Sequence, residues 1–205
     1  MENFFNILIK SIFIENMIFA FFLGMCSYIA VSKTVKTSNG LGIAVTFVLV
    51  ITTPMNYLLN EYILKEGALK WIDLSFAEID LSYLSFIVFI ATIAAIVQLV
   101  EMFVEKFSPS LYNALGIFLP LIAVNCAILG TSLFMQERAY SSILDVIAFS
   151  LGSGIGWWLA IVSLAAIREK IKYSNVPAPL KGVGITFILT GLMAIAFMGF
   201  MGIKI

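Results

Sequence analysis

The sequence contains no histidine and only two cysteines among its 205 residues. The absence of histidine excludes Ser-His-Asp hydrolysis, His-ligated haem, Rieske centres and His-bound zinc. Two cysteines are too few for a scaffold that depends on several disulfides. Lysine and arginine together number 12, and so do aspartate and glutamate. The chain therefore lacks the basic excess that is typical of nucleic-acid binding.

Charged side chains make up only 12% of the sequence, whereas 61% of its residues are hydrophobic and the mean hydropathy is +1.06. About a quarter of the residues of a soluble domain are charged, so the solvent of this chain is a lipid bilayer. A helix that crosses a bilayer needs about 20 apolar residues, and six continuous runs meet that length. They cover roughly residues 11–31, 41–60, 82–104, 111–134, 143–167 and 182–201. The sequence predicts an all-α integral membrane protein with six transmembrane helices, folded as one polytopic domain over residues 1–205.

The basic residues indicate an orientation. The loops after the first, third and fifth runs carry seven of them, namely Lys33, Lys36, Lys106, Arg168, Lys170, Lys172 and Lys181. The opposite side carries five, namely Lys10, Lys65, Lys70, Arg138 and Lys204. Because basic loops stay in the cytoplasm, both termini are predicted to be periplasmic.

The runs also indicate an internal repeat. Runs in corresponding places are offset by about 100 residues, which is also the separation of Cys26 and Cys126. Each half, about 1–107 and 108–205, holds three helices, and this odd number makes the second half enter from the opposite side. Gly24 and Pro120 predict that the first and fourth helices are interrupted. The expected fold is a 3+3 inverted-topology repeat, although any six-helix chain divides into three and three.

Two interpretations of the cysteines remain open at the level of the residues. A free cysteine is often a small buried apolar residue in a membrane helix. Alternatively, Cys26 and Cys126 are ligands of a [2Fe–2S] cluster, which needs four protein ligands. Because the chain has two thiols and no histidine, a second chain would have to supply the others. The residues therefore predict a cofactor shared between two chains or none.

Two carboxylates are candidates for an ion pathway. Glu15 lies near the start of the first run, and Glu101 lies near the end of the third. An ionisable side chain at membrane depth is a functional hypothesis by default, here for a cation. The alternative is that Glu101 lies at the membrane interface and that Glu15 caps a helix.

Small residues recur at every fourth position of the fifth run. They are Ala148, Gly152, Gly156 and Ala160. This spacing predicts a face on which another helix packs closely. Trp157 and Trp158 follow this face at a depth that favours a role in the core.

Several stretches together resemble one known family. They are Phe13–Met17, Phe22–Lys33, Leu111–Cys126, Gly152–Trp157, Ile167–Lys170 and Pro177–Gly182. The chain resembles the E subunits of the bacterial Na⁺-translocating NADH:quinone oxidoreductases, and the resemblance covers nearly its whole length. The paralogous A-type subunit of the Rnf complex is similar, but tends to have asparagine where this chain has Glu15. That difference favours the quinone reductase.

The resemblance implies a function in the bacterial inner membrane. A paralogous D subunit of opposite orientation is expected to share one [2Fe–2S] cluster with this chain, whose ligands would be Cys26 and Cys126. Electrons would pass between the side of the F subunit and the flavins of the B and C subunits, and the A subunit of the same quinone reductase would complete the complex. NADH and ubiquinone would not react on this chain itself. Glu101 resembles the family's membrane carboxylate associated with Na⁺ passage.

Three alternatives stay open. One is the A-type subunit of an Rnf complex. Another is an ion or small-solute transporter of the same 3+3 architecture that has no cofactor and uses Glu15 and Glu101. The third is a structural membrane subunit that packs through its small residues.

Overall fold

The computed structural model describes residues 2–64, 84–107, 119–140 and 142–202. Within these ranges all regular secondary structure is helical, as predicted. The first half comprises α1 (Glu2–Ile9), η1 (Lys10–Ile14), α2 (Met25–Val31), α3 (Val35–Leu59), η2 (Asn60–Leu64) and α4 (Ser85–Phe107). The second half comprises α6 (Leu119–Ala123), α7 (Cys126–Arg138), α8 (Ile143–Ile171), η6 (Ala178–Leu180), α9 (Val183–Met198) and η7 (Gly199–Gly202). Of the basic residues on which the predicted orientation depends, three lie outside the described residues, namely Lys65, Lys70 and Lys204.

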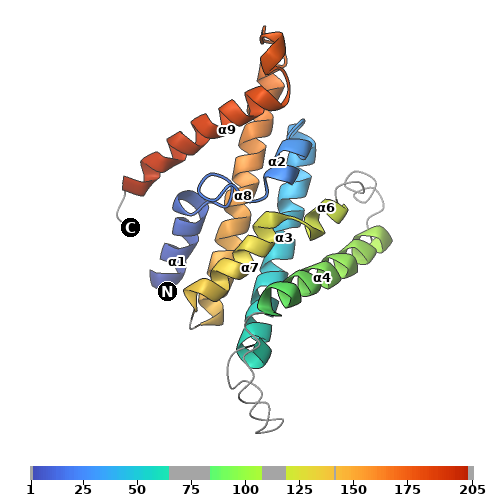
Figure 1. Ribbon diagram of the computed structural model, residues 1–205, viewed down its shortest axis with the longest axis vertical. Coiled ribbons are helices and arrows are strands. Elements are labelled where there is room, and N and C mark those ends of the chain that lie inside the picture. The colour runs from blue at the N-terminus through green and yellow to red at the C-terminus, as the bar shows by residue number, and fades with distance from the viewer. Residues whose placement is uncertain (1, 65–83, 108–118, 141, 203–205) are drawn as a thin grey trace.

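The two long helices α3 and α8 form the centre of the molecule. They lie side by side and run in opposite directions (Figure 1). Gly42 of α3 lies against Trp158 of α8, and Gly154 of α8 lies against Thr46 of α3. Helices α1 and η1 pack on α8, whereas α4 and α7 pack on α3.

Helices α4 and α9 lie on opposite flanks of this central pair (Figure 1). Both expose large apolar side chains, such as Leu99 on α4 and Ile195 on α9. A broad exposed apolar surface marks contact with a membrane or a partner protein.

Three helical segments of the described chain are long and apolar enough to cross a membrane. They are Val35–Leu64, Ser85–Phe103 and Ile143–Ile171. Of two shorter apolar helices, Val183–Met198 falls within the sixth predicted run, whereas Phe4–Ile14 overlaps only the start of the first run, which is predicted from residue 11. The structure thus confirms a helical protein with membrane-capable helices, of which three are continuous.

The first apolar run is interrupted where Gly24 predicted it. Residues 15–24 are not helical, and Gly24 has a φ of 81° at the N-cap of α2. That left-handed conformation is open to glycine at little cost.

The fourth run breaks at a different residue from the one expected. Pro120 lies within α6, and the helix continues past it. The described helix stops at Ala123, and Asn125 then caps the start of α7. The break therefore follows from the asparagine N-cap rather than from the proline.

The predicted face of small residues packs closely on the first helix. A Cβ atom added to Gly152 would lie 2.8 Å from the backbone oxygen of Leu8, and one added to Gly156 would lie 2.9 Å from that of Ile12. Ala148 and Ala160 are buried as well. The expectation of a close-packing face is confirmed.

Asn16 holds the interrupted segment against α8. Its Nδ2 donates to the carbonyl oxygens of Ile12 (3.0 Å) and Gly156 (2.9 Å). Its Oδ1 accepts from the backbone N–H groups of Ile18 (3.0 Å) and Phe19 (3.4 Å). These bonds take the place of helical hydrogen bonds. Backbone N–H and C=O groups at membrane depth need such partners, because no water is available there.

Candidate functional site

Both cysteines lie in the first turn of a helix that begins after a break. Cys26 is the second residue of α2, and Cys126 is the first residue of α7. Both are free thiols with exposed side chains. The first N–H groups of a helix lack helical partners and carry partial positive charge. These N–H groups are therefore available as hydrogen-bond donors beside each thiol, and thiolate sulfur is the form of cysteine that binds metal.

Hydrogen bonds join the two helix starts. The Nδ2 of Asn125 donates to the hydroxyl of Ser27 at 3.2 Å, across 98 residues of sequence. The Ser27 hydroxyl in turn donates to the carbonyl oxygen of Gly24 at 3.2 Å, and the Oδ1 of Asn125 accepts from Ala127 N–H at 3.0 Å. The residue after Cys26 is therefore bonded to the residue before Cys126. We call this bonded pair of helix starts the thiol junction.

Trp157 of α8 supports the thiol junction from the protein interior. A Cβ atom on Gly24 would lie 2.6 Å from the indole Nε1 of Trp157 and 3.0 Å from the Cβ of Ala127. The indole is wholly buried, as the interpretation of Trp157 as a core residue required. Its N–H has no hydrogen-bond partner within the described ranges.

The outer side of the thiol junction is apolar and open. Phe22, four residues before Cys26, is 56% exposed, and Val124, two residues before Cys126, is 74% exposed. In the part of the chain that the structure describes, no group of three or more potential metal ligands exists. Two accessible thiols in an apolar surrounding fit one half of a cluster site that a second chain completes. Within the described ranges, no group of ligands on this chain completes a metal site around them.

Sequence reasoning identified both cysteines but missed the roles of Asn125 and Trp157. The signal for Asn125 was present, because an asparagine inside an apolar run is a strong N-cap candidate. No local signal pointed to the contact of Trp157 with Gly24, since the two residues belong to different halves of the chain.

Glu15 lies in a cluster of charges at the end of η1. Its carboxylate pairs with Lys10 at 3.0 Å and with Arg138. The guanidinium of Arg138 also lies 4.9 Å from the ring centre of Phe149, within the range of a cation–π contact. This cluster borders a cavity of about 300 Å³. It brings the N-terminal segment and the turn after α7 to the same end of the molecule, as the charge pattern predicted.

Glu101 is placed apart from the other candidates. It is partly exposed on α4, which packs on α3, α6 and α7. The hydrogen bonds and ion pairs between described residues do not connect Glu101 with Glu15 or with either cysteine.

The opposite end of the molecule joins the first loop to the fifth. The guanidinium of Arg168 donates to the carbonyl oxygen of Ile29 at 3.0 Å and to the Ser32 hydroxyl at 2.7 Å. The carboxylate of Glu169 accepts from the backbone N–H of Val35 at 2.9 Å. These two loops therefore share one end of the molecule, as predicted.

The fold and the thiol junction define a multi-pass helical membrane protein that presents two thiols at the starts of half-helices. The chain belongs to the Rnf-Nqr family of membrane protein subunits, whose sequence model matches residues 4–204.

Relatives match the chain along its whole length. A protein of Maridesulfovibrio salexigens is 60% identical over 204 residues, and one of Methylococcus capsulatus is 57% identical over 205 residues, with full coverage of both chains in each case. A protein of Rhodopirellula baltica is 55% identical over 212 residues, which are 100% of this chain and 99% of that one. All three are named as the E subunit of a Na⁺-translocating NADH-quinone reductase, an oxidoreductase complex.

Proposed function

We propose that this chain is the E subunit of a Na⁺-translocating NADH:quinone oxidoreductase and that it transfers electrons within the membrane. Full-length identity of 55–60% to relatives of that name supports the assignment. The chain performs no bond chemistry on NADH or ubiquinone. It holds a redox centre that it shares with a paralogous D subunit.

The thiol junction is the observation that carries this proposal. The hydrogen bond between Asn125 and Ser27 fixes the two cysteine-bearing helix starts relative to each other. Cys26 and Cys126 would bind a [2Fe–2S] cluster as thiolates, and two cysteines of the D subunit would complete the ligand set. Such a cluster, when bound, supplies one-electron transfer.

The residues around the thiols have separate tasks in this proposal. The N–H groups in the first turns of α2 and α7 are available as hydrogen-bond donors to the sulfur atoms of a bound cluster. Phe22 and Val124 keep water away from the sulfur atoms once a partner covers them. Low water access and nearby N–H donors both tune the potential of a bound cluster.

The proposed architecture is six transmembrane helices in a 3+3 inverted repeat. Support comes from the order of elements, because each half has an interrupted helix, then a long central helix, then a peripheral helix. The antiparallel packing of α3 and α8 agrees with halves of opposite orientation. With the basic loops in the cytoplasm, both termini face the periplasm of a bacterial inner membrane.

For the coupled Na⁺, Glu101 is the stronger of the two candidate ligands on this chain. Carboxylate oxygens suit a hard cation, and the described residues offer Glu101 no basic partner within ion-pair distance. Glu15 is the weaker candidate, because Lys10 and Arg138 already compensate its charge.

The test is to measure iron, acid-labile sulfide and the electron paramagnetic resonance spectrum of the co-purified D and E subunits. Cys26→Ala and Cys126→Ala should each abolish the cluster signal while the two proteins still co-purify. Tyr173→Ala is the control, since it truncates a 92% exposed side chain in the turn after α8, outside the thiol junction, and should leave the signal intact. An unchanged cluster in both cysteine variants would contradict the proposal.

A further inference from the structure

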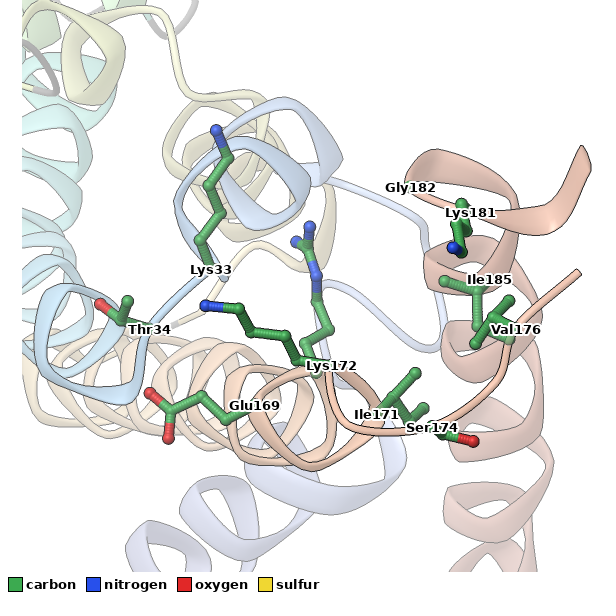
Figure 2. A pocket seen from close by; sticks show the side chains of 11 residues that line it. Lys33, Thr34, Glu169, Ile171, Lys172, Ser174, Val176, Lys181, Gly182 and Ile185 are labelled. Atoms are coloured by element: carbon green, nitrogen blue, oxygen red, sulfur yellow. The ribbon is translucent and has the colours of Figure 1, made fainter. Parts of the chain in front are cut away.

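A basic cavity lies at the end of the molecule where the first and fifth loops meet. Its volume is about 530 Å³, and Figure 2 shows the side chains that line it. Four of them are basic, namely Lys33, Arg168, Lys172 and Lys181. They come from the turn after α2, the last turns of α8 and the segment before α9, so only the folded chain brings them together.

The positive charge of this cavity is only partly compensated by the described residues around it. Glu169 is the one carboxylate among its described lining residues, so four cations face one anion, and that carboxylate also accepts from the backbone N–H of Val35. Arg168 donates to two neutral oxygens, those of Ile29 and Ser32. The ion pairs between described residues belong to the Glu15 cluster at the other end of the molecule. The cavity thus offers four cations to an anion from outside.

The basic cavity continues into an apolar one. A second cavity of about 690 Å³ shares Lys33, Thr34, Arg168 and Gly182 with the first. The rest of its lining is mostly apolar, comprising Ile29, Ala30, Val31, Thr37 and Val183. A cationic end joined to an apolar trough matches a molecule that has an anionic head and a hydrocarbon tail.

We propose that the two joined cavities bind an anionic phospholipid. Its phosphate lies among Lys33, Arg168, Lys172 and Lys181, and an acyl chain lies along the trough beside Ile29 and Val183. Basic pockets between transmembrane helices on the cytoplasmic side are suited to phosphate headgroups. Arginine adds a planar set of N–H donors that fits phosphate oxygens. Inorganic phosphate shares the charge but would leave the apolar trough unused.

The experiment measures lipid binding to the full-length chain in detergent by native mass spectrometry. Phosphatidylglycerol should stay bound at concentrations at which zwitterionic phosphatidylcholine does not. Replacing a basic side chain near a headgroup weakens binding about fivefold, so Lys33→Gln with Lys172→Gln should weaken it about twenty-five-fold.

The matched control is Lys36→Gln with Lys170→Gln. It removes the same charge from the same two loops, but neither side chain lines the cavities. Binding of phosphatidylglycerol should then fall by less than about threefold. Lys181→Gln is a second variant, from a third segment, and should weaken binding about fivefold even if the first pair fails to fold.

Three results would overturn the proposal. Equal losses in the cavity pair and the control pair would show attraction to surface charge in general. Displacement of phosphatidylglycerol by inorganic phosphate at equal concentration would assign the cavity to free phosphate. Loss of a neighbouring protein from the purified complex, with lipid binding unchanged, would assign it to an acidic protein segment. The lipid-binding result is independent of the proposed cluster, because the cavity variants should leave the cluster signal intact.

Discussion

At the scale of the residue, Gly24 meets two demands at the start of α2. Its φ of 81° lies in the left-handed region, and its Cα faces the Trp157 indole and the Asn125 side chain. A residue with a Cβ atom loses about 1–2 kcal/mol in that backbone conformation. The added Cβ would also lie 2.6 Å from Nε1 of Trp157 and 2.9 Å from Oδ1 of Asn125. Backbone strain and steric overlap at position 24 would therefore both destabilise the thiol junction.

Gly24→Ala is therefore expected to lower the free energy of unfolding by at least about 2 kcal/mol, as strain and overpacking add. Thermal unfolding in detergent, followed by tryptophan fluorescence, measures the loss. The matched control is Gly191→Ala in α9, where an added Cβ has no atom within 4 Å. That substitution should be neutral or stabilising by up to about 1 kcal/mol. Similar stability of the two variants would show that Gly24 is not under strain.

Also at the residue scale, the two cations of the Glu15 cluster differ in burial. The side chain of Arg138 is 25% exposed, whereas that of Lys10 is 54% exposed. An exposed ion pair contributes about 0–1 kcal/mol, but a charged group that loses its partner while buried costs about 1–3 kcal/mol. Glu15 should therefore be coupled strongly to Arg138 and weakly to Lys10.

A double-mutant cycle tests this difference. Glu15→Gln combined with Arg138→Gln should give a coupling energy of about 1–3 kcal/mol, and combined with Lys10→Gln at most about 0.5 kcal/mol. Unfolding in mixed micelles at low and high salt measures both energies. Only the Lys10 coupling should vanish at high salt, because exposed charges are screened. Equal couplings would mean that Glu15 does not distinguish its two partners.

At the scale of the element, continuous helices were predictable and the breaks were only partly so. The runs at 41–60, 82–104 and 143–167 correspond to α3, α4 and α8, because their length and apolar composition leave a bilayer-spanning helix as the one suitable structure. The first run is predicted to start at residue 11 as one interrupted helix. The structure has the interruption, but the helix begins earlier, at Glu2, and the break covers all of residues 15–24.

The reason for that difference lies in contacts between distant segments. Asn16 ends the first helical segment by bonding to Gly156, which is 140 residues away. Asn125 breaks the fourth run by capping α7 and bonding to Ser27. One sequence shows an asparagine inside an apolar run, but not the partner that makes a break stable there. For this reason the sequence pattern alone favours a break at Pro120.

At the scale of the whole molecule, the described chain has a well-packed centre and a surface with large exposed apolar areas. The α3–α8 pair is buried along its contact, whereas α4, α9 and the outer side of the thiol junction expose large apolar side chains. From its two cysteines the sequence predicted a cofactor shared with a second chain or none, and the shared cluster stays a proposal. The basic cavity could not be foreseen in the same way. Counting charges placed its residues on one side, but only the fold gathers them around one space.

The last prediction concerns the orientation of the whole molecule in the membrane. In a variant without its own cysteines, single cysteines replace Lys36 in the first loop, Tyr173 after α8, and Glu137 at the end of α7. All three positions are at least partly exposed. If the basic loops face the cytoplasm, a membrane-impermeant maleimide should label Lys36→Cys and Tyr173→Cys only in inside-out vesicles and Glu137→Cys only in intact spheroplasts. The reverse pattern would place the termini in the cytoplasm but keep the repeat. Labelling of Lys36→Cys and Glu137→Cys from the same side would rule out the inverted topology, because the fold puts these positions at opposite ends of the molecule.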